Sequence, residues 1–100
     1  MGKAGITNAL RNNNLIMITI HYFASIRELL DQSQQQLELP ANVSTVNELI
    51  QHLVNSEPEK LQILTDPSKV LIAVDQTVAD RNHVLSGDEE VAFFPPMTGG

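Results

Sequence analysis

The residues best suited to take part in a chemical reaction lie at the end of the chain, which reads Phe94-Pro95-Pro96-Met97-Thr98-Gly99-Gly100. A terminal glycine carboxylate can be activated as a mixed anhydride with AMP, and a sulfur or nitrogen nucleophile then reaches an acyl carbon that no side chain shields. The two prolines fix φ and remove two backbone donors, so we expect an extended course. Five extended residues, 96–100, span at most about 17 Å, enough to enter a deep pocket of another protein. The alternative is a frayed end without a role.

Other kinds of catalytic or metal site find little support in the residue types. The chain has no cysteine, which excludes disulfides, thiolate zinc sites and a cysteine nucleophile. His21, His52 and His83 are far apart in sequence and lack the spacing of a metal motif. No motif places a serine, a histidine and a carboxylate together. We therefore expect no metal and no bound cofactor.

Length and charge limit the domain count and the partners. One hundred residues are enough for a single domain, and 6 Lys and Arg against 12 Asp and Glu give a formal net charge of −6. The basic residues are scattered singly, so nothing resembles a stripe that neutralises phosphates. No apolar run approaches the roughly 18 residues of a membrane span. We expect no nucleic acid or membrane partner, and we expect basic partner surfaces.

Hydrophobic periodicity predicts strands and helices in an order typical of a small mixed sheet. Thr45 and Glu48 form a capping box before apolar residues at helical spacing, which predicts the main helix. Residues 70–74 are a continuous apolar run, which predicts a central strand buried on both faces. The other expected elements are strands at 16–22, 35–39, 77–79 and 90–95, and short helices at 24–30 and 58–64.

This order predicts an α+β fold of the β-grasp type, with a mixed sheet of about five strands packed on one main helix and short helices beside it. We expect a flexible N-terminal extension at 1–16, the β-grasp domain at 17–95 and the extended tail at 96–100. Met17 is a plausible natural start. The extension is poor in side chains that pack.

Two phenylalanines are expected outside the core. Successive strand residues point to opposite faces, so Val91 and Phe93 form one pair and Phe94 faces away from it. Phe23 likewise lies opposite the apolar row of the first strand. Exposed aromatic side chains at the root of the tail indicate an interaction patch, unless a loop or the first helix covers them.

These residues resemble a known family, the small sulfur-carrier subunits of molybdopterin synthase, which are ThiS-like and ubiquitin-related. The similarity lies in Phe23-Ala24-Ser25-Ile26-Arg27-Glu28, in Ala73-Val74-Asp75-Gln76, and above all in residues 85–100, which read LSGDEEVAFFPPMTGG. It runs from about Met17 to Gly100. Asp75 and Met97 depart mildly from the commoner Asn and Val.

The resemblance implies a β-grasp fold and a carrier role for Gly99 and Gly100. An activating enzyme would use ATP to adenylate Gly100, which would become a thiocarboxylate and donate sulfur to cyclic pyranopterin monophosphate in the large subunit. As the small subunit of this sulfurtransferase, the chain would hold no complete active site and would bind no cofactor itself. The resemblance implies that Pro96, Met97 and Thr98 thread the tail into its partners.

The same resemblance implies two partners, the large subunit, in a heterotetramer of two large and two small subunits, and the activating enzyme. It assigns the partner interface to Phe23, Arg27, Val78, Phe94 and Pro95, with Arg27 toward the activating enzyme. We expect a cytoplasmic protein. The alternatives are a sulfur carrier for thiamine synthesis or tRNA thiolation, and a ubiquitin-like protein modifier or plain interaction domain.

Overall fold

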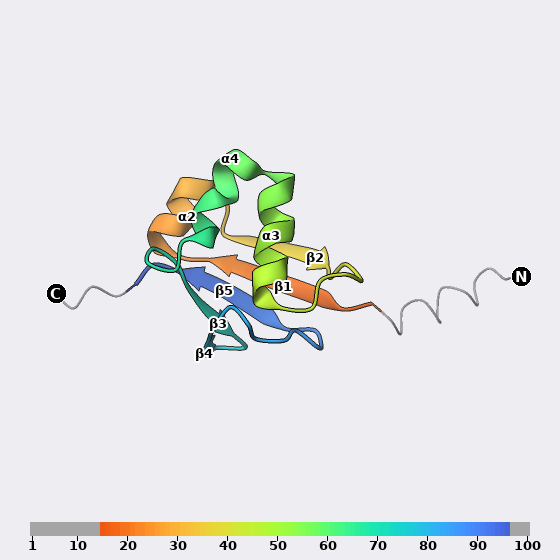
Figure 1. The fold of residues 1–100 in the computed structure, drawn as a ribbon. Helices are drawn as coiled ribbons and strands as arrows, with labels where there is room; N and C mark the ends of the chain where they lie inside the picture. Colours follow the sequence, from red (N-terminus) through yellow and green to blue (C-terminus); the bar gives the residue numbers. More distant parts are fainter. Residues whose placement is uncertain (1–14, 97–100) are drawn as a thin grey trace, which may run out of the picture.

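A computed structural model describes residues 15–96 as a five-stranded mixed sheet with helices packed on it (Figure 1). The strand order is β2-β1-β5-β3-β4. Strands β1 and β5 are parallel, and every other neighbouring pair is antiparallel. The strands are β1 (Met17–Tyr22), β2 (Gln34–Glu38), β3 (Leu71–Val74), β4 (Thr77–Ala79) and β5 (Glu90–Phe94).

The helices lie on one face of this sheet (Figure 1). They are α2 (Ala24–Leu30), α3 (Val46–Ser56), α4 (Pro58–Leu61) and the 3₁₀ helix η1 (Gln62–Thr65). The predicted helix at 58–64 is therefore one α-helical turn followed by a 3₁₀ turn. The mixed sheet against a main helix confirms the predicted α+β fold of the β-grasp type.

Helix α3 forms for the reason that the sequence indicates. The Thr45 side chain accepts a hydrogen bond from the Glu48 backbone N–H (3.2 Å), and the Glu48 carboxylate accepts one from the Thr45 N–H (3.2 Å). Two donors of the helix N-terminus are thereby satisfied. The buried residues at helical spacing then face the sheet, and they are Val46, Leu49, Ile50, Leu53 and Val54.

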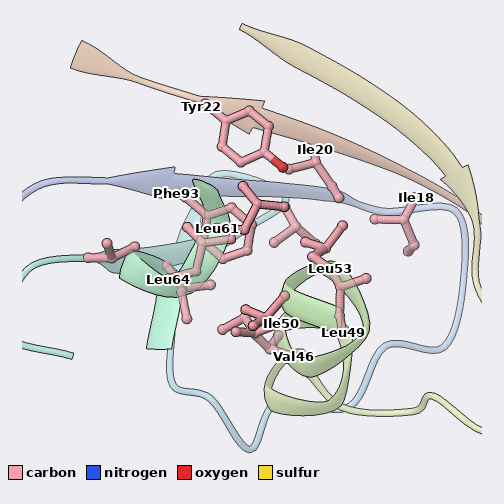
Figure 2. Packing of buried hydrophobic residues seen from close by; sticks show 14 of the residues in the cluster. Ile18, Ile20, Tyr22, Val46, Leu49, Ile50, Leu53, Leu61, Leu64 and Phe93 are labelled. Carbon is pink, nitrogen blue, oxygen red and sulfur yellow. The ribbon is translucent and has the colours of Figure 1, made fainter. Parts of the chain in front are cut away.

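The core fills the space between α3 and the covered face of the sheet (Figure 2). Ile18, Ile20 and Tyr22 come from alternate positions of β1, and Val91 and Phe93 come from β5. The rings of Tyr22 and Phe93 stack, with centroids 5.9 Å apart. Since Phe93 is fully buried, the predicted inward pairing of Val91 and Phe93 is confirmed.

The prediction of a central strand buried on both faces at residues 70–74 is wrong. The central strand is β5, and β3 lies between β5 and the edge strand β4. Val70, Ile72 and Val74 are buried, whereas Leu71 is 36% exposed on the face that the helices leave open. A strand covered on both faces and a strand with one face open to solvent can have the same apolar run, so the sequence pattern alone did not distinguish these two arrangements.

The turn between β3 and β4 is tight. Asp75 and Gln76 both have positive φ, 49° and 70°. Two central residues in the left-handed region characterise a type I′ turn, whose twist matches that of the flanking strands. Within residues 15–96, no helix combines the length and hydropathy required to cross a bilayer.

Candidate functional site

The sheet face opposite the helices, which we call the open face, is where the exposed apolar side chains of several strands meet. His21, Ala92, Ala73 and Val78 are register partners on four neighbouring strands, β1, β5, β3 and β4. Side chains of directly paired residues lie on the same face of a sheet. They therefore form one row across the open face.

A second row lies toward the end of β5. Leu71 pairs with Phe94, and Phe23 follows the last residue of β1. Phe23 is 48% exposed, Val78 is 72% exposed, and Phe94 is half-buried. Adjacent exposed apolar side chains on one face mark a binding surface more often than isolated ones do. The structure thus brings three predicted interface residues, Phe23, Val78 and Phe94, to the same open face.

A shallow groove of about 450 Å³ runs along this face. Its lining residues are His21, Phe23, Ala73, Gln76, Glu90, Ala92 and Phe94. The small side chains of Ala73 and Ala92 form the floor between larger neighbours. A groove of this size can take a side chain of another protein, and Phe23 and Phe94 are its two aromatic lining residues apart from His21.

Backbone hydrogen bonds fix the position of Phe23. Its N–H donates to the Phe93 carbonyl oxygen (3.1 Å), and its own carbonyl accepts from the Ile26 and Arg27 N–H groups (3.1 and 3.3 Å). Ala24, the next residue, has φ of 55°. This left-handed residue turns the chain sharply at the corner, so that Ile26 and Leu30 of α2 pack into the core while Phe23 stays on the open face.

Arg27 lies in the last turn of α2, one helical turn beyond Phe23. It is exposed and lines a small hollow with Glu28, Asp31, Gln32 and Ser33. A cation near a helix C-terminus is favourably placed against the helix dipole. The structure therefore places the predicted basic contact outside the groove, one helical turn along α2 from Phe23.

The predicted tail, residues 96–100, begins two residues after the end of β5. Pro95 and Pro96 directly follow Phe94 and are half-buried. Met97, Thr98, Gly99 and Gly100, on which the carrier chemistry was predicted, lie outside the described residues. The predicted extension at 1–16 also lies outside them, apart from Leu15 and Ile16.

Sequence reasoning missed several residues of the open face. Leu71 and Ala73 were assigned to a strand buried on both faces, and neither His21 nor Glu90 was included among the predicted interface residues. Alternation places His21 on the same face as Phe23, and Glu90 on the same face as Phe94. Those two parities would have identified both residues, but the pairing of β1 with β5 that makes them neighbours is a tertiary fact.

Electrostatically, the groove combines apolar walls with one ionisable pair. The His21 Nε2 and Glu90 Oε2 atoms are 3.7 Å apart, and the His21 ring stacks against Phe23 with centroids 6.1 Å apart. No three His, Asp or Glu side chains within residues 15–96 gather as metal ligands would. The arrangement suits protein recognition.

The family comparison agrees with this geometry. The model of the ThiS family matches residues 20–100, which include β1 from Ile20 onward, the strands β2 to β5 and the Gly-Gly end. The chain belongs to the ThiS family. It is 38% identical over 84 residues to the molybdopterin synthase sulfur carrier subunit of Escherichia coli, a match that covers 84% of this chain and all of that protein.

Solved structures of other proteins share the fold. Small archaeal modifier protein 1 of Haloferax volcanii superposes with a TM-score of 0.64 at 17% identity, covering 82% of this chain and 99% of that one. A chain from the complex of subunits 1 and 2 of the molybdopterin-converting factor of Helicobacter pylori superposes with a TM-score of 0.55 at 21% identity, covering 85% and 100%. Because a modifier and a converting-factor subunit share this fold, the fold alone does not decide between those roles.

Proposed function

We propose that this ThiS-family chain is the sulfur-carrier small subunit of a molybdopterin synthase. The observation that carries the proposal is the 38% identity across the whole length of the E. coli sulfur carrier subunit. The structure adds support, because the exposed apolar groove ends at Phe94, the residue before Pro95 and Pro96. A protein that docks on the open face is thus held next to the root of the tail.

The proposed chemistry takes place at the Gly100 carboxylate. Its oxygen attacks the α-phosphorus of ATP in the activating enzyme, and pyrophosphate leaves. A sulfide-level sulfur nucleophile then attacks the acyl carbon, AMP leaves with the carboxyl oxygen, and a thiocarboxylate remains. In the large subunit its sulfur bonds to a carbon of cyclic pyranopterin monophosphate as a carbon–oxygen bond of that substrate breaks and the oxygen leaves, and water then cleaves the acyl–sulfur bond to restore the carboxylate. Two dithiolene sulfurs require two deliveries.

The division of labour follows from what each partner has to supply. A thiocarboxylate is lost to hydrolysis when water reaches it, so the large subunit must enclose it and provide the groups that bind substrate. A narrow channel can admit the segment from Pro96 to Gly100, because it has no aromatic side chain and ends in two glycines. In our proposal this chain contributes the reagent and the docking face to the sulfurtransferase. Because adenylation consumes ATP, we place the reaction in the cytoplasm.

The proposed partners are the large synthase subunit and the adenylating enzyme. The H. pylori structure is a complex of subunits 1 and 2 of the molybdopterin-converting factor, which supports a large-subunit partner for this chain. We propose two large and two small subunits for the assembly. Two partners that use one tail in turn require moderate affinity, and a groove with a modest apolar surface is consistent with such affinity.

The decisive experiment is intact-mass analysis of the full chain after incubation with activating enzyme, ATP and a sulfur donor. We expect the mass increase that corresponds to exchange of one oxygen for one sulfur at Gly100. A chain that ends at Thr98 is the control, and it should fold normally without gaining this mass. Absence of the increase in the full chain would overturn the proposal.

Complementation separates the remaining alternatives. A carrier for thiamine synthesis or tRNA thiolation would restore a strain that lacks that pathway and would leave a strain without the molybdopterin carrier unrestored. A protein modifier would form conjugates through Gly100 to lysine side chains, which mass spectrometry of cell extracts detects. We expect restoration of the molybdopterin pathway only.

A further inference from the structure

Glu90 is a charged residue in the groove of the open face, next to apolar walls. Its side chain is 53% exposed, and its nearest ionisable partner is His21, at 3.7 Å between Nε2 and Oε2. That separation is longer than a direct hydrogen bond. The Glu90 carboxylate therefore keeps hydrogen-bonding capacity that only water or a docking protein can use.

The position of Glu90 is rigid although its carboxylate is exposed. The Glu90 N–H donates to Asp75 Oδ1 (2.9 Å), and the Asp75 N–H donates to the Glu90 carbonyl oxygen (2.8 Å). On the other side, Glu90 pairs with Thr19 of β1. A group on a strand fixed from both sides is presented at low entropic cost.

The charge on the open face has one sign. Strand parity and register assign twelve residues of strands β1 to β5 to it, in addition to Phe23 beyond the end of β1, and these residues include two glutamates and a histidine but no lysine or arginine. They are Met17, Thr19, His21, Gln34, Gln36, Glu38, Leu71, Ala73, Val78, Glu90, Ala92 and Phe94. Arg27, Lys60, Lys69 and Arg81 lie on helices or loops instead. A complementary surface must therefore be basic.

We propose that Glu90 is a specificity-determining residue that receives a lysine or arginine side chain of the large subunit when that subunit docks on the open face. This inference rests on the proposed function. The cation enters the groove between the Phe23 side and the β3–β4 turn, and the His21 ring, stacked on Phe23, forms the wall beside it. The apolar contacts hold the partner, and Glu90 fixes which surface fits.

Burial of Glu90 on docking allows this residue to distinguish one partner surface from another. A carboxylate that loses water on docking and gains no donor costs free energy, whereas a charge-assisted hydrogen bond recovers it. A surface that is apolar but lacks a cation opposite Glu90 is therefore rejected. Glu38 offers the contrast, because it lies on the same face but on β2, two strands away from β5 and outside the groove.

The test compares Glu90→Gln with Glu38→Gln for binding of the full-length chain to the cognate large subunit by calorimetry at several salt concentrations. Both variants remove one negative charge from the open face and keep the side-chain shape. For Glu90→Gln we expect about a tenfold or greater rise in Kd and a weaker dependence of Kd on salt. For Glu38→Gln we expect a change of less than about threefold, with the salt dependence of the wild type.

Two outcomes would overturn the inference. One is a Glu90→Gln variant that binds as the wild type does, and the other is an equal effect of both substitutions, which would indicate only a diffuse influence of net charge. Unfolding curves of both variants verify that the fold is intact. Failure of the wild-type chain to bind the large subunit at all would count against the proposed function instead, so the two ideas fail separately.

Discussion

The backbone N–H of Phe23 donates a hydrogen bond to the carbonyl oxygen of Phe93 at 3.1 Å. This bond joins the exposed corner before α2 to the strand that leads into the tail. One phenylalanine of the pair is 48% exposed and the other is fully buried. The two phenylalanines, whose backbones share this hydrogen bond, therefore have different roles, one on the surface and one in the core. Substitution of each by alanine should have different effects.

Phe23→Ala should weaken docking and leave stability nearly unchanged. The side chain is half exposed, so we expect the free energy of unfolding to fall by less than about 1 kcal/mol while the Kd for the large subunit rises about tenfold or more. Phe93→Ala, the matched control, should lower the free energy of unfolding by about 3–5 kcal/mol. Urea denaturation and calorimetric titration measure the two quantities. Equal destabilisation by both substitutions would show that Phe23 belongs to the core.

Gln76→Gly should stabilise the protein. Gln76 has φ of 70° in the type I′ turn, a conformation that costs a residue with a Cβ about 1–2 kcal/mol and costs glycine almost nothing. After the greater chain entropy of unfolded glycine is subtracted, we expect a gain of about 0.5–1 kcal/mol in the free energy of unfolding. Thr77→Gly, one residue on in β4, should instead destabilise. The midpoints of denaturant unfolding of both variants and the wild type measure these changes. A loss of stability in Gln76→Gly would contradict the turn assignment.

Glu48→Gln should lose less stability in acid than the wild type does. Hydrogen bonds from the Ser44 N–H (2.7 Å), the Ser44 hydroxyl (2.9 Å) and the Thr45 N–H (3.2 Å) hold the pKa of the Glu48 carboxyl below its usual 4.5. The stability that this carboxylate contributes is therefore complete above pH 4.5 and is lost as pH falls through the lower pKa of the folded state.

Thermal unfolding over a pH series measures this effect. The wild type should lose more stability than Glu48→Gln on passing from neutral to acid pH. Glu59→Gln, which removes an exposed carboxylate from α4, is the control for the loss of one negative charge. Parallel curves for the wild type and Glu48→Gln would show that the capping box does not shift this carboxyl.

Tyr22 should titrate far above an ordinary phenol. Burial, with a smaller effect from the Glu57 carboxylate, raises the pKa of Tyr22 from 10.0 to about 12. The chain has one tyrosine and no tryptophan, so tyrosinate absorbance reports this residue alone. We expect a midpoint near pH 12 in the native protein and near pH 10 in urea. A native midpoint near pH 10 with intact circular dichroism would refute the burial argument.

The same shift predicts alkaline instability. Because the folded state holds the phenol proton more tightly, the resulting stability is complete below pH 10 and is lost as pH rises toward 12. Tyr22→Phe should remove this loss. At neutral pH it should cost about 1 kcal/mol, since the Tyr22 hydroxyl donates to Gln35 Oε1 at 3.2 Å. Chemical denaturation of both proteins across this pH range provides the comparison.

Much of the fold was predictable because its signals are local. The capping box at Thr45 and Glu48 and the apolar positions that follow it define α3 without reference to the rest of the chain. Strand alternation assigned Phe93 to the core and Phe94 to the other face, because the period of two is a property of extended backbone. The family, too, was recognisable from the motifs at Phe23 to Glu28 and Ala73 to Gln76 and from the carboxyl end.

Only the tertiary structure decided which face is open and what meets on it. Leu71 is as apolar as Ile72, and nothing in the run that contains them shows that the helices cover one face of β3 and leave the other to solvent. The nearness of His21 to Glu90 depends on β1 lying parallel to β5, across nearly seventy residues of sequence. Periodicity fixes the direction of each side chain relative to its own strand, whereas strand order is set by how the whole chain buries its apolar surface.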